Sequence, residues 1–457
     1  MQLSSRSQAH GDAQLVRRLG VWSATGLVVG ITIGAGIFRT PSVVATRVPD
    51  PTLMIAVWLL GGAISLCGAL SVAELAASLP HTGGWYVFLR EGWGRLAGFL
   101  FGWSELVLIR ASATGAVATV FSEYLLRSLG ISPIPAGLVN AVAAVAIVCT
   151  ALLNIRGVQI GAAIAGVSSV AKFGGLVLLV LLSAVLSSEP RQEAAIAAAT
   201  SIDPSLFGLA LISALWAYDG FADVSFSAGE VSNPSRTLPR AIVGGTLAII
   251  AIYIAANAAY LHVNGIEGMA ASKLVAADTM QALVGRFGGA FISVVVMLST
   301  LGTLAGVMLT APRIFFAMAD DGVFFRGLSR VHARYNTPYV AITLAATLGV
   351  IFVLTRTFEQ LADTFVISIW PFYGIAIAGL YRLRRTRADL SRPYSVPGYP
   401  LVPAIFIAGV IFLVGSAMVA DPIWTGVTFA IVLAGIPVYT LFFTKRRDRR
   451  DRRDRRE

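Results

Sequence analysis

The stretch GLVVGITIGAGIFRTPS, Gly26 to Ser42, lies in the first long apolar segment of the chain and decides the fold. Four of the eleven residues from 26 to 36 are glycine, a poor helix former because its backbone has the most freedom to lose. In hydrocarbon, non-helical backbone persists only where it lines a cavity or is packed inside protein. We therefore interpret this stretch as a break in a membrane helix that marks a binding site.

The composition is that of a membrane protein. Hydrophobic residues make up 56% of the 457 residues and charged residues 13%, whereas a soluble chain is typically about 25% charged. The apolar runs are continuous, unlike the short alternating strands of a membrane β-barrel. The sequence predicts an all-α polytopic membrane protein with no soluble domain. The twelve predicted spans are roughly 20–45, 51–79, 95–126, 137–154, 159–187, 204–230, 239–263, 287–318, 338–355, 361–383, 401–420 and 422–444.

The positions of Lys and Arg predict the orientation. With the N-terminal tail 1–19 in the cytoplasm, 26 of the 35 Lys and Arg residues lie on the cytoplasmic side and 7 on the outer side. Both termini are then cytoplasmic, and we expect a plasma (cell inner) membrane location. The polar tail 1–19 does not resemble a cleavable signal peptide. The basic tail 445–457 follows a span directly, so we expect it to lie on anionic lipid headgroups rather than to bind nucleic acid.

A second break is predicted in the sixth span, LISALWAYDGFADVSFSAGE, at Ala217 to Gly220. This span carries two carboxylates within four positions of each other, in the middle of the apolar run. The two breaks lie about five spans apart, which fits a five-plus-five inverted repeat with halves at about 20–187 and 204–385.

Two facing breaks can hold an amino acid. The helix that starts after Gly36 presents free N–H groups at a positive dipole end, which can hold a carboxylate. A side chain at Gly36 would crowd that carboxylate. The carbonyls that end before Gly34 and near Ala217 can hold an ammonium group. The alternative is a kinked helix packed closely against its neighbours through small residues.

Three motifs, in order, resemble a known family. GITIGAGIF resembles the first-helix signature of the amino acid–polyamine–organocation superfamily, and ALSVAELAASLPHTGGWYVFLREGWG, Ala69 to Gly94, resembles its second-helix signature. WAYDGFADVSFSAGEVSNPSRTLPRAI, Trp216 to Ile242, is similar to the sixth helix and loop of the L-type amino acid transporter branch. LVLIRASATGAVATVFSEYLL in span three also fits that branch.

The resemblance implies a LeuT-type fold: a ten-helix transport core at 20–385 with broken helices 1 and 6, followed by two additional helices at 401–444. It implies an amino acid transporter that works by alternating access. Trp216 would close over the substrate from outside, with Ala217 and Asp219 beside it. The residues implied to contact the substrate backbone are Thr32, Ile33, Gly34, Ala35 and Gly36.

The resemblance also bears on partners. Animal members of the branch pair with a glycoprotein chain through a cysteine in the loop after span three. Here that loop, SLGISPIPAG, has no cysteine, and both Cys67 and Cys149 fall within predicted spans. We therefore expect no disulfide-linked heavy chain.

Lys172 lies about thirteen residues into span five, roughly 20 Å from its inner end, too deep for its side chain to reach water easily. An ionisable residue at this depth is a functional hypothesis by default. In transporters of the resembling family, a lysine here takes the place of a sodium ion and touches the first helix. This implies sodium-independent transport with Lys172 as the coupling residue and protons as a candidate coupling ion. The alternative is a structural cation bonded to backbone carbonyls.

The other buried charges keep more than one interpretation. Asp219 is either the partner of a basic substrate or a cap on the inner half-helix, and Asp223 is interpreted as a helix N-terminal charge. Arg110 is expected to face the bundle interior, but its five-residue separation from Glu105 is a poor same-face spacing on a helix, so no partner is assigned. Glu74 and Glu230 are expected to pack or gate near inner helix ends.

Other classes of protein explain less of the sequence. A membrane enzyme would need a nucleophile–base set or metal ligands at depth, and the four histidines, His10, His81, His262 and His332, all lie near span ends or in loops. A channel would show a repeated filter sequence or rings of like charge. No pattern indicates a cofactor or a metal. We predict a sodium-independent exchanger or proton symporter for small to medium neutral L-amino acids, with basic amino acids or polyamines as the alternative through Asp219.

Overall fold

A computed structural model of the chain describes residues 19–81, 83–157, 160–186, 203–320, 324–335 and 337–444. The tails expected at 1–19 and 445–457 lie outside these ranges, except for Leu19. Within them every named element is a helix, which confirms the all-α prediction. The α-helices are α1 (Val21–Thr32), α2 (Gly36–Arg47), α3 (Pro51–Ser78), α4 (Trp85–Trp93), α5 (Arg95–Ser104), α6 (Arg110–Ser128), α7 (Ala136–Ile155), α8 (Ile160–Leu186), α9 (Pro204–Tyr218), α10 (Pro234–Ala271), α11 (Val275–Asp320), α12 (Tyr339–Thr355), α13 (Phe358–Thr386), α14 (Leu401–Ala420), α15 (Pro422–Leu433) and α16 (Gly435–Tyr439). The π-helices are η1 (Glu105–Ile109) and η4 (Thr440–Thr444), and the 3-10 helices are η2 (Asp223–Glu230) and η3 (Arg326–Ser329).

The helices account for the predicted spans. In the described ranges, nine helical segments are long and apolar enough to cross a membrane, and the bent pair α1–α2 makes up to ten. The shorter apolar segments of α8 and α12 correspond to the remaining two predicted spans. Helices α10 and α11 extend beyond the predicted spans 239–263 and 287–318, changing direction at Gly265 and Gly285. Both glycines have a positive φ, which explains why the sequence places a glycine at each bend.

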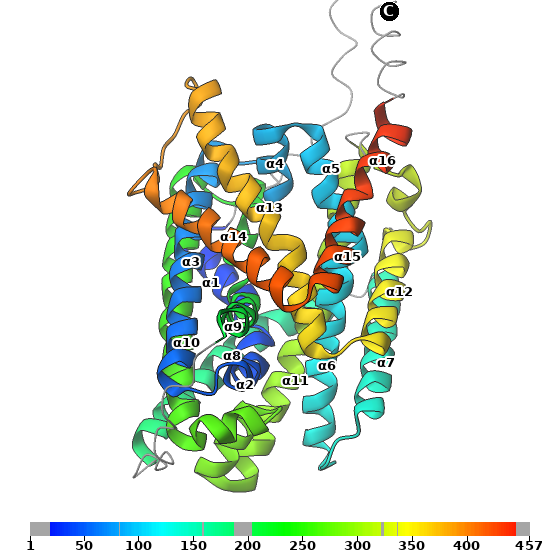
Figure 1. The fold of residues 1–457 in the computed structure, drawn as a ribbon. Coiled ribbons are helices and arrows are strands. Elements are labelled where there is room, and N and C mark those ends of the chain that lie inside the picture. Colours follow the sequence, from blue (N-terminus) through cyan, green and yellow to red (C-terminus); the bar gives the residue numbers. More distant parts are fainter. Residues whose placement is uncertain are drawn as a thin grey trace, which may run out of the picture.

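The broken helices occupy the middle of the bundle (Figure 1). Helix α2 packs against α9, and α1 packs against α10. Helices α3 and α10 pack together on one side, and α6, α7 and α12 pack together on the other. Helices α13 and α14 both contact α9 and each other. The two breaks are therefore enclosed by neighbouring helices, as non-helical backbone in a membrane requires.

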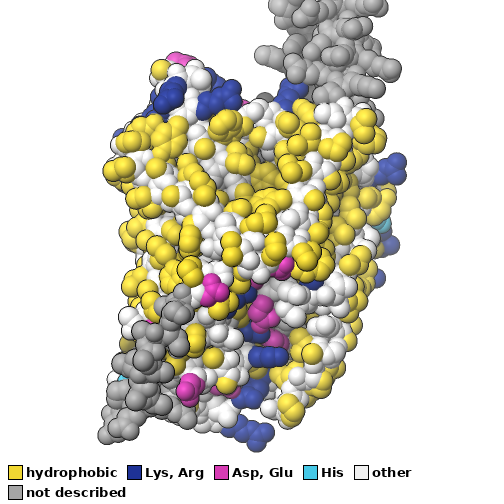
Figure 2. Space-filling view, viewed as in Figure 1, with side chains coloured by type: hydrophobic (Ala, Val, Ile, Leu, Met, Phe, Trp, Pro, Cys, Tyr) yellow, Lys and Arg dark blue, Asp and Glu magenta, His cyan; other side chains and the backbone are white. Residues whose placement is uncertain are grey.

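The bundle has two ends that differ in their charges. At the α4 end, drawn at the top of Figure 1, α3 and α13 finish and α5 begins. At the opposite end, which we call the α2 end, α2 finishes and α3 and α13 begin. Figure 2 shows a broad hydrophobic band between Lys and Arg side chains at the α4 end and a mixed group of acidic and basic side chains toward the α2 end. The band is the surface expected to face lipid.

Local sequence signals explain where several helices begin. The Asp50 carboxylate accepts a hydrogen bond from the Leu53 N–H, and Pro51 occupies the first helical position of α3. Thr357 and Gln360 form a reciprocal capping box at the start of α13. These caps set where α3 and α13 begin at the α2 end.

Candidate functional site

The first span breaks where its glycines predict. Helix α1 ends at Thr32 and α2 begins at Gly36, and the two axes differ by 44°. The Gly34 N–H donates to the Thr32 carbonyl at 2.8 Å, a tight turn that ends the helix. No side chain caps the start of α2, where Ala35 is the N-cap residue. The first N–H groups of α2 are therefore free of side-chain caps and lie at a positive dipole end.

The second break begins at Asp219. Helix α9 ends at Tyr218, Asp219 is extended, and Gly220 has φ of +102° before η2 starts. The break was predicted at 217–220, and the structure confirms it with a shift of two residues. A Cβ at Gly220 would lie 3.0 Å from Ile31 and 3.1 Å from the Thr32 Oγ1, at the end of α1. Gly220 therefore provides both the backbone conformation and the space for the two breaks to meet.

Gly36 has a packing role that the sequence did not predict. A Cβ at this position would lie 2.6 Å from the Cα of Ala217, so the space beside Gly36 is filled by the backbone of α9. The expectation was that glycine leaves room for a substrate carboxylate. The structure adds a packing role, because glycine allows α2 and α9 to touch and any side chain would separate them.

Tyr253 of α10, which was not predicted from the sequence as a site residue, joins the two breaks. Its Oη lies 2.9 Å from the Thr32 carbonyl oxygen and 3.1 Å from the Ala217 carbonyl oxygen. The hydroxyl has one proton, so it donates to one of these carbonyls at a time. The carbonyls expected to be free for an ammonium group are therefore partly satisfied by Tyr253. The signal in the sequence was a lone hydroxyl in the apolar run AIIAIYIAA.

Lys172 contacts the first helix, as the resemblance implied. Its side chain is buried in α8, with 3% exposure. The Nζ donates to the Gly30 carbonyl oxygen at 2.6 Å, two residues before α1 ends. A cation therefore lies beside the last turn of α1, where unpaired carbonyls make the field negative.

Trp216 lies at the α2 side of the breaks. It is 9% exposed and packs edge-to-face against Phe358 of α13, with ring centroids 5.2 Å apart. The Arg39 guanidinium of α2 lies over the other ring of this pair, 4.8 Å from the Phe358 centroid. These three side chains form a cover over the meeting point of the breaks.

Asp219 is bound by a side chain from another helix. The Tyr373 hydroxyl of α13 donates to its carboxylate at 3.0 Å. Among the described residues no backbone N–H donates to Asp219, so the predicted helix-cap role is not seen there. Asp223 is the first residue of η2, in agreement with its interpretation as a charge at a helix N-terminus.

Arg110 has a partner that helical spacing did not predict. Residues Glu105 to Ile109 form a π-helix, in which hydrogen bonds join residues five apart. The Arg110 Nε therefore reaches the Glu105 carboxylate at 2.5 Å, although the pair is five residues apart. No partner was assigned to Arg110 from the sequence because the spacing was judged on an α-helix, and the π-helix supplies one. Arg110 also interacts electrostatically with Asp223, which places a positive charge near the second break.

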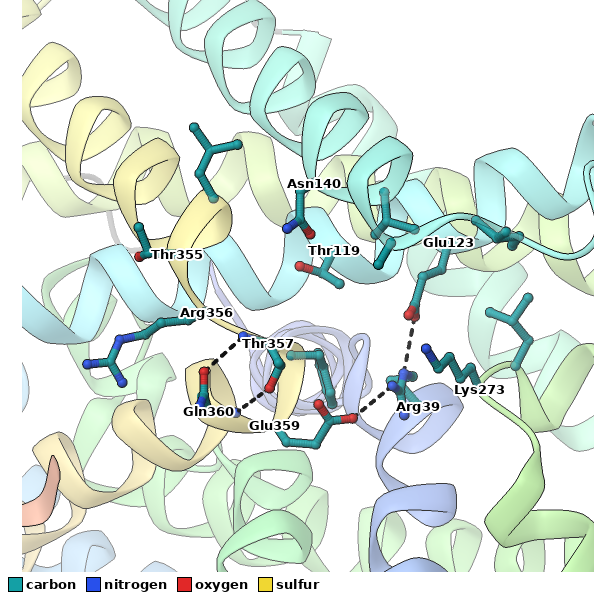
Figure 3. Close-up of a pocket in the computed structure, with 16 residues that line it drawn as sticks. Arg39, Thr119, Glu123, Asn140, Lys273, Thr355, Arg356, Thr357, Glu359 and Gln360 are labelled. Carbon is teal, nitrogen blue, oxygen red and sulfur yellow. Dashed lines mark hydrogen bonds and ion pairs between the residues drawn. The ribbon is translucent and has the colours of Figure 1, made fainter. Parts of the chain in front are cut away.

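A cavity opens at the α2 end, beyond the cover over the breaks (Figure 3). Its volume is about 350 Å³. In Figure 3, Glu123 and Glu359 converge on Arg39, and Lys273 lies beside them. The Arg39 Nε donates to Glu123 at 3.1 Å, and a terminal nitrogen donates to Glu359 at 2.9 Å. Phe358 lines this cavity and also packs against Trp216, so it separates the cavity from the breaks.

The structure brings the predicted substrate residues together. Those of the first and second breaks meet where α2 touches α9 and Gly220 touches α1. Most of them are buried, so the site is closed in this structure. Lys172 of α8 contacts the Gly30 carbonyl, which lies two residues before α1 ends at the first break. The predicted residues at the meeting point are Thr32, Ile33, Gly34, Ala35, Gly36, Trp216, Ala217 and Asp219.

Broken helices that meet inside a membrane bundle define the class of protein as a secondary transporter. Residues 19–443 match the amino acid permease family, and the chain belongs to this family. Its members are transporters rather than enzymes. Family membership agrees with the LeuT-type fold predicted from the sequence.

Several characterised proteins are similar over nearly the whole chain. The serine/threonine exchanger SteT of Bacillus subtilis is 34% identical over 433 residues, covering 94% of this chain and 97% of that protein. The human cystine/glutamate transporter is 31% identical over 433 residues, covering 94% of this chain and 86% of that protein. The human b(0,+)-type amino acid transporter 1 is 29% identical over 458 residues, covering 96% of this chain and 90% of that protein.

Proposed function

We propose that the chain is a sodium-independent amino acid transporter of the plasma membrane that works by alternating access, with both termini in the cytoplasm. The observation that carries this proposal is the contact between the two helix breaks at Gly36 and Ala217. In this orientation the α2 end faces outward and the α4 end faces the cytoplasm. Both cysteines lie inside helices, so we propose that it works without a disulfide-linked heavy chain.

The two charged groups of an amino acid have complementary partners at the breaks. The substrate carboxylate binds the uncapped N–H groups at the start of α2, where the dipole is positive. The ammonium group binds the carbonyls at the ends of α1 and α9. Tyr253 donates to only one of the Thr32 and Ala217 carbonyls at a time, and each carbonyl oxygen can accept two hydrogen bonds, so acceptor sites remain for the ammonium group.

Lys172 supplies the charge that a coupling cation would otherwise supply. Its ammonium group is fixed on the Gly30 carbonyl and needs no dissolved ion to complete the site. The movement of α1 between inward-open and outward-open states is then coupled to this contact. A lysine at this position supports either obligatory exchange or transport driven by protons.

We propose small to medium neutral L-amino acids as substrates. The walls that the breaks provide are a tryptophan and small residues, Trp216 with Ala35 and Ala217, which suit a short side chain. The similarity to a serine/threonine exchanger supports the same substrate class.

The second candidate is transport of basic amino acids or polyamines, with Asp219 as the partner of the cationic group. It is favoured by a carboxylate at the second break that has one hydroxyl partner, Tyr373. The variant Asp219→Asn keeps an oxygen for that hydroxyl and removes the charge. A selective loss of arginine or putrescine uptake in this variant would establish the second candidate, whereas neutral uptake alone in the unmodified protein would exclude it.

The test is uptake into proteoliposomes with a panel of labelled amino acids. Uptake is measured with and without sodium, with a pH gradient, and with unlabelled amino acid inside the vesicles. We expect uptake without sodium, and a dependence on internal amino acid would identify an exchanger. Uptake driven by a proton gradient into empty vesicles would identify a symporter. Sodium-dependent uptake, or no amino acid uptake under any condition, would contradict the proposal.

A further inference from the structure

A second cavity, separate from the breaks, opens at the α4 end of α10. It has a volume of about 460 Å³ and lies between the first turns of α10 and the segment that joins α13 to α14. We call it the Arg236 groove. Its lining residues are Ser235, Arg236, Pro239, Arg240, Val243, Gly244, Leu247, Pro393 and Tyr394.

The lining of the groove changes from basic to apolar along the helix. Arg236, Arg240, Gly244 and Leu247 recur at intervals of three or four residues, so they form one stripe on α10. The two arginines occupy the first turns of the helix, and Leu247 lies eleven residues after Arg236, about 16 Å further into the membrane span. A molecule that fills the groove therefore meets positive charge at one end and hydrocarbon at the other.

Both arginines are available to a ligand. Arg236 and Arg240 are exposed, and in the described part of the chain neither side chain forms an ion pair or a hydrogen bond. This differs from Arg384 and Arg392 at the same end of the bundle, which both pair with Glu74. Two unpaired guanidinium groups one helical turn apart can both reach one phosphate.

The opposite wall of the groove is held rigidly. Arg392 donates hydrogen bonds to the carbonyls of Leu383, Arg387 and Leu390, which folds the start of the segment onto the end of α13. The Val396 N–H donates to the Glu74 carboxylate of α3 at 2.8 Å. Pro393 and Tyr394 lie between these anchors, so the groove is formed before a ligand arrives.

We propose that the Arg236 groove binds one anionic phospholipid of the inner leaflet, with its phosphate on Arg236 and Arg240 and an acyl chain along Gly244 and Leu247. A phospholipid is favoured over a soluble anion because the apolar half of the groove lies on a membrane-spanning helix. The assignment of the groove to the inner leaflet rests on the orientation proposed above, with the α4 end in the cytoplasm. It does not depend on which substrate is transported. The lipid contacts the segment that joins α13 to α14, and this segment is bound to α3 through Glu74. Lipid binding therefore also favours the closed arrangement of the α4 end.

The test is a thermal-unfolding titration of the full-length chain in mild detergent. Phosphatidylglycerol and phosphatidylcholine with identical acyl chains are compared as added lipids. We expect phosphatidylglycerol to raise the unfolding temperature at lower concentrations than phosphatidylcholine, following the linkage between binding and stability. In Arg236→Gln/Arg240→Gln, about tenfold more phosphatidylglycerol is expected for the same shift, because each arginine near a headgroup contributes to binding.

Two further variants make the result specific. Arg95→Gln/Arg385→Gln removes the same charge from exposed arginines at the same end but outside the groove, and should respond like the unmodified protein. Gly244→Leu fills the apolar half, where a Cβ meets no atom within 4 Å, and should weaken lipid binding without disturbing the helix. Both variants are checked by their unfolding temperature without lipid.

Four outcomes would overturn the proposal. An equal response in Arg236→Gln/Arg240→Gln and in Arg95→Gln/Arg385→Gln would mean attraction to the basic surface in general. An equal response to both lipids would remove the role of the negative charge. Stabilisation by soluble glycerol phosphate at the same concentrations would assign the groove to a free phosphate. If lipid binds only after residues 2–17 are deleted, the occupant of the groove in the full-length chain would be that segment and not a lipid.

Discussion

Single hydrogen bonds decide the chemistry at the ends of the broken helices. The Gly30 carbonyl accepts from Lys172, and the Thr32 and Ala217 carbonyls share Tyr253. These partners are positive or proton-donating, as the negative end of a helix dipole favours. The start of α2 has no side-chain cap, which leaves its positive end for the substrate.

We expect Lys172→Ala to reduce the initial rate of uptake by about tenfold or more, because a hydrogen bond to a charged group contributes about 1.5–3 kcal/mol. The measurement is initial uptake into proteoliposomes, normalised to the amount of reconstituted protein. Lys172→Arg is the control that keeps the positive charge and should retain more activity. Unchanged kinetics in the alanine variant would remove Lys172 from the mechanism.

At the scale of the helices, two local features create contacts that regular α-helices with ordinary side chains would not make. Helix α2 touches α9 where Gly36 meets Ala217, and the π-helix η1 turns Glu105 toward Arg110. The first contact depends on the missing side chain of Gly36, and the second depends on the π-helical turn. A substitution at each feature therefore tests whether the contact contributes to stability.

Gly36→Ala should lower the free energy of unfolding by about 1–3 kcal/mol, because the new methyl group overlaps the backbone of α9. Gly26→Ala is the matched control in the neighbouring helix, where a Cβ meets no atom within 4 Å. It should be neutral or stabilise the protein by up to about 1 kcal/mol. Thermal unfolding of both purified variants provides the comparison, and equal effects would mean that α2 and α9 do not touch.

Arg110→Met should destabilise the protein by about 3–5 kcal/mol, because it leaves the Glu105 carboxylate buried without its partner. The Glu105 side chain is 1% exposed, so water cannot replace the arginine. The double variant Glu105→Gln/Arg110→Met should recover part of this loss. Unfolding by denaturing detergent in mixed micelles measures both, and a double variant that is less stable than Arg110→Met would argue against the pairing.

The sequence contained the break positions but not the contacts between them. Gly34, Gly36 and Gly220 mark the breaks because glycine in an apolar run is locally unfavourable in a helix. Tyr253 was not predicted, because its role depends on α10 lying beside both breaks. The Glu105–Arg110 pair was missed because a π-helix changes the spacing at which side chains meet.

For the whole molecule, each end of the bundle has a charged network that can hold that end closed while the other end opens. At the α2 end, Arg39 joins α2 to Glu123 of α6 and Glu359 of α13. At the α4 end, Glu74 of α3 binds Arg384 of α13. Alternating access requires that one end opens while the other stays closed.

Arg39→Gln should favour opening at the α2 end, because it removes both ion pairs at once. The probe is Thr32→Cys in a background with Cys67→Ser and Cys149→Ser, reacted with a membrane-impermeant thiol reagent from the outer side. We expect about tenfold faster reaction, which corresponds to a shift of 1.4 kcal/mol. Arg127→Gln, which breaks a pair between α6 and α11 at the same end, should leave the rate unchanged. Equal rates with and without Arg39 would exclude it as a gate.

The same probe gives the most direct test that the two breaks form the substrate site. Thr32→Cys is alkylated in proteoliposomes with and without the amino acid that the uptake panel selects, at about ten times its dissociation constant. We predict about tenfold slower alkylation with substrate, because about 90% of the sites are occupied. Leu129→Cys, at an exposed position after α6, should show no protection. Equal alkylation of Thr32→Cys with and without a transported amino acid would contradict the account, because the substrate would then bind elsewhere.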